Sequence, residues 1–107
     1  EWRQYLILKG ANTIIADPTG TLEVLPCATS ALAHGGSGDV LAGIAVGLLA
    51  QGLPVWDAAR LAVWLHAACA RLALQKTGHA AAVLAGDLVS AIGQALHYLE
   101  SGEIFFA

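Results

Sequence analysis

Three glycines and a serine stand immediately before an aspartate in the segment Gly35-Gly36-Ser37-Gly38-Asp39. Because glycine lacks a Cβ atom, the backbone N–H groups of such a segment can approach an anion closely and point at it. The apolar run over residues 40–50 is typical of a helix, whose N-terminus adds unpaired N–H groups and the positive end of its dipole. The junction is therefore predicted to bind phosphate.

Asp39 has two interpretations. Asp is favoured at helix starts simply as a cap, and for an isolated Asp that reading would be preferred. Here the carboxylate follows an anion-binding glycine segment, and a base beside bound phosphate is what phosphoryl transfer to a hydroxyl requires. We therefore predict a functional Asp39. The segment is neither a Walker A loop, since no Gly-Lys-Ser/Thr follows, nor the dinucleotide fingerprint.

Strands are expected first along the chain, at residues 5–8, 13–16 and 22–25, with a hairpin turn at residues 17–20. Helices are expected at residues 39–51, 57–76 and 87–99. The first helix is apolar on nearly every side, which predicts deep burial. The order predicts an α/β fold, the end of a sandwich in which an edge hairpin closes a largely parallel sheet and three helices cover a face.

Composition excludes several classes of protein. Of the 107 residues, 57% are hydrophobic and 12% are charged, so a disordered chain is not expected. The net charge of −3 gives no reason to expect nucleic acid or an anionic membrane as partner. No apolar run approaches the roughly 20 residues of a spanning helix, and the polar start does not resemble a signal peptide. A cytoplasmic protein is expected.

The cysteines and histidines show no metal-ligand spacing, so no protein-held metal is predicted. Cys27 and Cys69 are interpreted as buried thiols in a reducing compartment. His66, in the middle of a predicted helix, is interpreted as a hydrogen-bonded core or interface histidine, and His79 and His97 as surface residues.

Several motifs in order carry a family resemblance that extends over essentially the whole chain. The segment from Gly35 to Asp39 resembles the glycine-rich signature of the ribokinase superfamily. Residues 35–44, closing in Leu-Leu-Ala-Gln-Gly at 48–52, are similar to the C-terminal half of NAD(P)H-hydrate dehydratases. Residues 8–16 resemble that family's Lys-Gly-Ala-x-Thr nucleotide-binding stretch, and residues 65–66 and 84–88 are further landmarks.

The resemblance implies a lyase that restores NADH or NADPH from the hydrated cofactor, with ADP or ATP as the phosphate source and ADP preferred. It implies that Asp39 contacts the hydrated substrate and its hydroxyl and serves as the base. The residues expected at the nucleotide are Lys9, Gly10, Ala11, Asn12, Thr13, Gly35, Gly36, Ser37 and Gly38. Any Mg²⁺ is expected to arrive with the nucleotide phosphates.

Two other functions remain open. A small-molecule kinase of the same fold, acting on a hydroxyethylthiazole-type or sugar substrate, would use the same anion hole and base. A non-catalytic nucleotide-binding fragment is the third possibility.

The chain lacks Met and starts at Glu1, from which we expect residues 1–107 to be the C-terminal part of one ribokinase-like nucleotide-binding domain whose N-terminal part is missing. That part would supply most of the hydrated cofactor's pocket. His34 departs from the family's usual small or basic residue. An incomplete sheet should expose an unpaired edge and an apolar face, so a homo-oligomer or a companion chain is expected.

Overall fold

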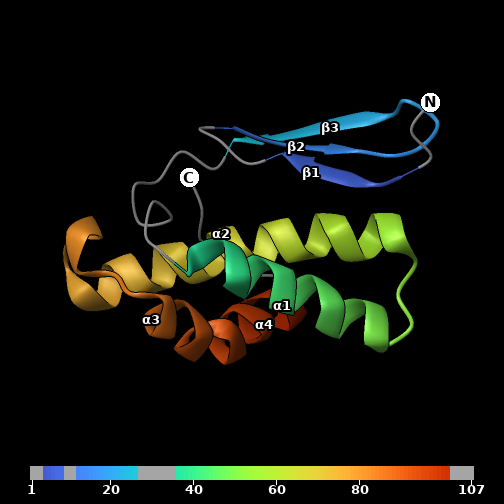
Figure 1. Ribbon diagram of the computed structural model, residues 1–107. Coiled ribbons are helices and arrows are strands. Elements are labelled where there is room, and N and C mark those ends of the chain that lie inside the picture. The colour runs from blue at the N-terminus through green and yellow to red at the C-terminus, as the bar shows by residue number, and fades with distance from the viewer. Residues whose placement is uncertain (1–3, 9–11, 27–35, 102–107) are drawn as a thin grey trace.

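The computed structural model describes residues 4–8, 12–26 and 36–101, and in these ranges the chain forms a three-stranded sheet on a layer of helices (Figure 1). The strands are β1 (Leu6–Leu8), β2 (Asn12–Ala16) and β3 (Leu22–Pro26). The helices are α1 (Ser37–Ala50), α2 (Val55–Thr77), α3 (Ala85–Ser90) and α4 (Ile92–Ser101), with a short 3-10 helix, η2 (Ala80–Ala82), between α2 and α3. The α/β class is confirmed, with strands first and helices after.

The described sheet is antiparallel throughout, in the order β1-β2-β3, so the expectation of a largely parallel sheet is wrong for this part of the chain. The physical reason is the tight connection between β2 and β3, since parallel neighbours would need a long crossover. At this turn the Asp17 side chain accepts hydrogen bonds from the Thr19 and Thr21 N–H groups, both at 2.9 Å, and Gly20 adopts a φ of +92°. The predicted hairpin is confirmed.

The two faces of the sheet differ in burial. Thr13 and Ile15 of β2 are buried on the face toward α2, which is the helix nearest the sheet in Figure 1. On the opposite face Leu8, Leu22 and Val24 are 56%, 64% and 56% exposed. The sheet therefore packs on one side only among the described residues, and its outer face is apolar.

The core is built around α2. One side of this 23-residue helix is lined with small and medium apolar side chains, which allow the neighbouring helices to approach closely. Leu41 and Leu48 of α1, Leu88 of α3 and Ala95 of α4 are buried in the same cluster. Helix α2 ends at Gly78, whose φ of +83° is the left-handed conformation expected of a C-cap glycine.

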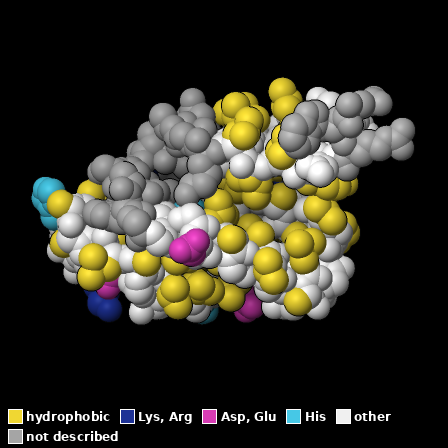
Figure 2. Space-filling model, in the orientation of Figure 1, with side chains coloured by type: hydrophobic (Ala, Val, Ile, Leu, Met, Phe, Trp, Pro, Cys, Tyr) yellow, Lys and Arg dark blue, Asp and Glu magenta, His cyan; other side chains and the backbone are white. Residues whose placement is uncertain are grey.

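Helix α1 is buried along one side only, which corrects the expectation of deep burial. Its buried residues are Ser37, Leu41 and Leu48, while Val46 is 65% and Leu49 is 42% exposed. The helix packs on α2 and α3, and no described element covers its other side. Figure 2 shows hydrophobic side chains spread over this view of the molecule, on the sheet and on the helices below it.

The third predicted helix is two helices, because the chain turns at Ala91. The Ser90 hydroxyl donates to the Gly86 carbonyl oxygen at 2.9 Å, a back-bond that bends helices. The Ala91 N–H bonds to the Leu88 carbonyl oxygen at 3.1 Å, three residues back, so the last turn of α3 is tightened. The chain therefore has four α-helices in its described part where three were expected.

Candidate functional site

The predicted anion-binding segment lies at the N-terminus of α1. Gly36 precedes the helix with φ +89° and ψ −13°, a left-handed conformation that glycine adopts without strain. The Val40 N–H donates to the Gly36 carbonyl oxygen at 3.1 Å, and this bond closes the first helical turn. The N–H groups of Ser37, Gly38 and Asp39 therefore belong to the helix start, where a backbone has no carbonyl of its own helix to bond.

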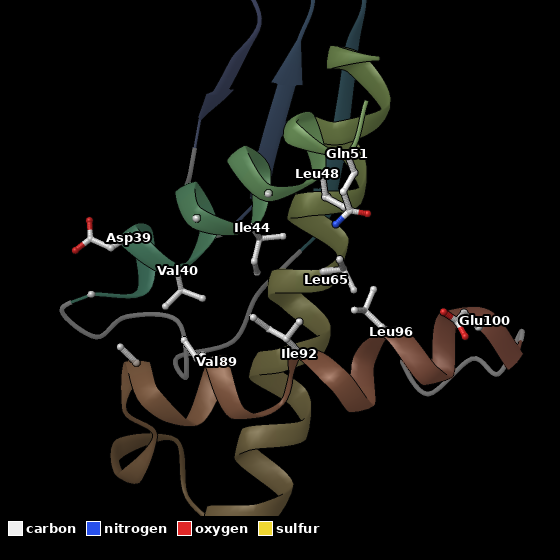
Figure 3. Close-up of a pocket in the computed structure, with 14 residues that line it drawn as sticks. Asp39, Val40, Ile44, Leu48, Gln51, Leu65, Val89, Ile92, Leu96 and Glu100 are labelled. Atoms are coloured by element: carbon white, nitrogen blue, oxygen red, sulfur yellow. The ribbon is translucent and has the colours of Figure 1, made fainter. Parts of the chain in front are cut away.

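Asp39 is exposed in the first turn of α1. Figure 3 shows its carboxylate pointing away from the apolar side chains of Ile44 and Ile92. A carboxylate in this position is open to a ligand bound at the helix start. Its side chain makes no capping bond to the helix, since the cap position is Gly36.

Ser37 is held from below by α2. Its side chain is 1% exposed, and the His66 ring nitrogen Nε2 lies 2.9 Å from the Ser37 carbonyl oxygen and 3.1 Å from its Oγ. His66 is itself 3% exposed. The interpretation of His66 as a hydrogen-bonded core histidine is confirmed, and the residue it bonds belongs to the candidate site.

Gly36 is held by α3. A Cβ atom at this position would lie 3.1 Å from the Cβ of Ala85, so a side chain has little room there. The start of α3 is fixed in turn by Asp87, whose Oδ2 accepts the Leu84 N–H at 2.9 Å. The glycine segment thus lies between α2 and α3.

A groove runs from this segment along α1, between α1 on one side and α3 and α4 on the other (Figure 3). Its volume is about 730 Å³. Most of its lining is apolar, with Asp39 at one end and Glu100 at the other. The lining residues are Gly36, Asp39, Val40, Gly43, Ile44, Gly47, Leu48, Gln51, Leu65, Ala85, Val89, Ile92, Leu96 and Glu100.

The structure brings together Gly36, Ser37, Gly38 and Asp39 from the predicted set. Thr13 is buried in β2, away from solvent, and Asn12 begins the same strand. Lys9, Gly10, Ala11 and Gly35 lie outside the described residues. The nucleotide-binding role of all these positions stays a prediction.

The sequence marked three residues only as parts of family-like landmarks and did not predict that they hold the segment: Ala85, Asp87, and His66, which acts through Ser37. A histidine flanked by leucine and alanine in the middle of a predicted helix was a signal, because a buried polar group needs a partner. The partner could not be identified, since it lies 29 residues earlier in the chain.

The donor set at the start of α1 fits a phosphate group, because backbone N–H groups and a helix dipole favour an anion and the glycines leave it room. The described residues contain no group of three or more His, Cys, Asp or Glu side chains that could hold a metal ion. In the same ranges no helix is long and apolar enough to cross a membrane.

Comparison with known proteins identifies the family. Residues 2–94 match the family described as NAD(P)H-hydrate dehydratase. A bifunctional NAD(P)H-hydrate repair enzyme of Moorella thermoacetica is 43% identical over 100 residues, which cover 94% of this chain and 19% of that protein. An ADP-dependent (S)-NAD(P)H-hydrate dehydratase of Neisseria meningitidis is 44% identical over 86 residues, which cover 80% of this chain and 29% of that protein.

A solved structure gives the same result. The ADP/ATP-dependent NAD(P)H-hydrate dehydratase of Bacillus subtilis, co-crystallised with ATP and Mg²⁺, superposes with a TM-score of 0.80 at 35% identity. The superposition covers 87% of this chain and 33% of that one. The chain thus spans between about a fifth and a third of the length of these relatives.

Proposed function

The chain belongs to the NAD(P)H-hydrate dehydratase family. From this premise we propose that the protein to which the chain belongs converts hydrated NADH or NADPH back to NADH or NADPH in a nucleotide-dependent dehydration. ADP is the proposed phosphate source in preference to ATP. One relative is named for ADP dependence, and another was crystallised with ATP and Mg²⁺. Residues 1–107 are proposed to be the C-terminal part of one ribokinase-like domain.

The observation that carries the proposal is the placement of Asp39 one residue after a glycine segment at the start of α1. The N–H groups of residues 36–38 are proposed to bind the nucleotide phosphates, with any Mg²⁺ arriving on those phosphates. Lys9, Gly10, Ala11, Asn12, Thr13 and Gly35 are proposed to contact the nucleotide as well.

The proposed reaction has two steps. Asp39 accepts the proton of the ring hydroxyl, whose oxygen bonds to the terminal phosphorus while the phosphorus–oxygen bond to the leaving nucleotide breaks. The carbon–oxygen bond of the resulting phosphate ester then breaks and its electron pair leaves with phosphate, while a neighbouring ring C–H gives up its proton to water and the double bond of the reduced nicotinamide forms again. Hydrated NADH and ADP thus give NADH, AMP and phosphate.

The test supplies the full-length gene product with hydrated NADH and either ADP or ATP and follows the recovery of reduced-nicotinamide absorbance. Asp39→Asn should lower the rate by at least about a hundredfold and leave nucleotide affinity nearly unchanged, because it removes the base and not the N–H groups. Asp57→Asn is the matched control, since Asp57 is also an exposed aspartate in the first turn of a helix.

Each other outcome identifies an alternative. Nucleotide binding without recovery, together with phosphorylation of a small alcohol, would favour a kinase of the same fold. Nucleotide binding without any turnover would favour a binding module.

A further inference from the structure

The feature that the proposed function leaves unused is the buried contact between His66 and Ser37. The two residues come from different helices, and both are almost completely buried. A carbonyl oxygen can only accept a hydrogen bond, so the 2.9 Å contact requires that Nε2 of His66 carry the proton. The Ser37 Oγ, 3.1 Å from the same nitrogen, lies within reach of that proton as a second acceptor.

This bond acts on the backbone. Ser37 lies between Gly36 and Gly38, which have the fewest restrictions on their dihedral angles of any residue type. A carbonyl fixed in direction also fixes the plane of the peptide that follows, and with it the direction of the Gly38 N–H. A contact to the serine side chain alone would not do this.

The opposite side of the segment has its own support. Ala85 of α3 packs against Gly36 so closely that a Cβ there would approach to 3.1 Å. Asp87 fixes this end of α3 through its bond to the Leu84 N–H. The segment is thus fixed on one side by the hydrogen bond from His66 and on the other side by van der Waals contact with Ala85.

We propose that His66 is a positioning residue for the nucleotide site, which directs the N–H groups at the start of α1 through its bond to the Ser37 carbonyl. The proposal rests on the proposed function for the identity of the anion. It assigns no proton transfer to His66, because the ring is buried beneath the segment and faces the backbone. Groups that bind a developing charge are effective when their direction is fixed before the ligand arrives.

The experiment compares His66→Gln with His66→Asn in the full-length gene product. The amide nitrogen of glutamine can reach the place of Nε2, whereas that of asparagine lies nearer to Nδ1 and falls short of Ser37. The ADP dissociation constant is measured by titration calorimetry, and thermal stability is measured by calorimetric unfolding. The values of kcat and KM are measured with hydrated NADH as substrate. Leu72→Ala is the stability control, a buried change in the same helix two turns away.

His66→Asn should weaken ADP binding about tenfold, and His66→Gln should restore it to within about threefold of the wild type. Leu72→Ala should lower the melting temperature and leave ADP affinity unchanged. The proposal is wrong if His66→Gln and His66→Asn bind ADP equally well, or if neither weakens binding more than Leu72→Ala does. A wild-type protein that binds ADP without dehydrating hydrated NADH would refute the proposed function, while the ADP affinities would still decide the role of His66.

Discussion

At the scale of single residues, the candidate site sets a carboxylate beside a place for an anion. Two negative groups within one helical turn repel each other, so positive charge is needed between them, and the backbone can supply part of it. The N–H groups of the glycine segment and the dipole of α1 do so at the first turn, where the dipole is effective. The exposed Asp39 can then face a substrate hydroxyl while the backbone holds the anion.

The position of this segment at a helix start could be predicted from the sequence because it depends on local residue types, while its anion-binding role stays a prediction. Gly36, Ser37, Gly38 and Asp39 are neighbours in the chain and lie where the helix start was expected. The support beneath them could not be predicted. The bond from His66 spans 29 residues, and nothing in the periodicity of either helix specifies the rotation that brings the two together.

A second buried group gives a prediction that concerns stability alone. Cys69 is completely buried, and the loss of solvent raises the pKa of its thiol from 9.0 to about 11. Between these values the unfolded chain has released the proton and the folded chain has kept it, so unfolding becomes more favourable as the pH rises. Wild type should therefore lose about 2 kcal/mol relative to Cys69→Ala between pH 9 and pH 11.

Denaturant unfolding of both proteins across this pH range measures the difference directly, since groups common to both cancel. Below about pH 8, where the thiol is protonated in both the folded and the unfolded chain, the difference should be constant. A difference that stays constant to pH 11 would mean that the thiol is not held in its neutral form by the fold.

At the scale of elements, the β2–β3 hairpin could be predicted because its turn is specified locally. Asp17 accepts hydrogen bonds from residues two and four positions later, and Gly20 takes the left-handed conformation. The division between α3 and α4 was missed, because the apolar spacing of the two helices continues through Ala91. The back-bond from Ser90 ends α3, and serine is compatible with an unbroken helix as well.

The start of α1 offers a matched pair of substitutions. Gly36 and Gly20 have nearly the same φ, +89° and +92°, but a Cβ would approach Ala85 to 3.1 Å at Gly36 and would meet nothing within 4 Å at Gly20. Alanine at either position should cost about 1–2 kcal/mol of unfolding free energy through the left-handed backbone. Gly36→Ala should in addition weaken ADP binding by about tenfold or more, because Ala85 and the segment must move apart.

Unfolding and ADP titration of the two full-length variants give both quantities. Equal ADP affinity in Gly36→Ala and Gly20→Ala would show that the packing of α3 against Gly36 does not determine the geometry of the anion site.

At the scale of the whole molecule, α1 shows why a sequence pattern can predict an element and misjudge its surroundings. Its apolar residues cover nearly the full circumference, which predicts a helix enclosed on every side. The described elements enclose one side, and the groove of about 730 Å³ opens along another. Burial depends on what lies next to a helix, and the chain spans about a third or less of the length of its relatives from Moorella, Neisseria and Bacillus.

The outer face of the sheet leads to a prediction on assembly. Leu8 of β1 and Leu22 and Val24 of β3 are each more than half exposed there, on the same face of the sheet with β2 between them. An apolar face of this kind favours association with another surface. We expect residues 1–107, expressed alone, to sediment above the monomer mass in a concentration-dependent manner. The double substitution Leu22→Thr with Val24→Thr should shift the distribution toward monomer. Threonine is β-branched and suits a strand, so the sheet itself should be retained.

Val46→Gln is the matched control, since Val46 is 65% exposed on α1 and lies outside the sheet. If Val46→Gln dissociates the assembly as effectively as the two strand substitutions, contacts between helices hold it together and the sheet face does not. A monomer at all concentrations would remove the prediction of self-association. The two results differ in meaning. The first would make the exposed apolar side of α1 the contact surface, whereas the second would mean that the exposed leucines and valines face solvent without driving association.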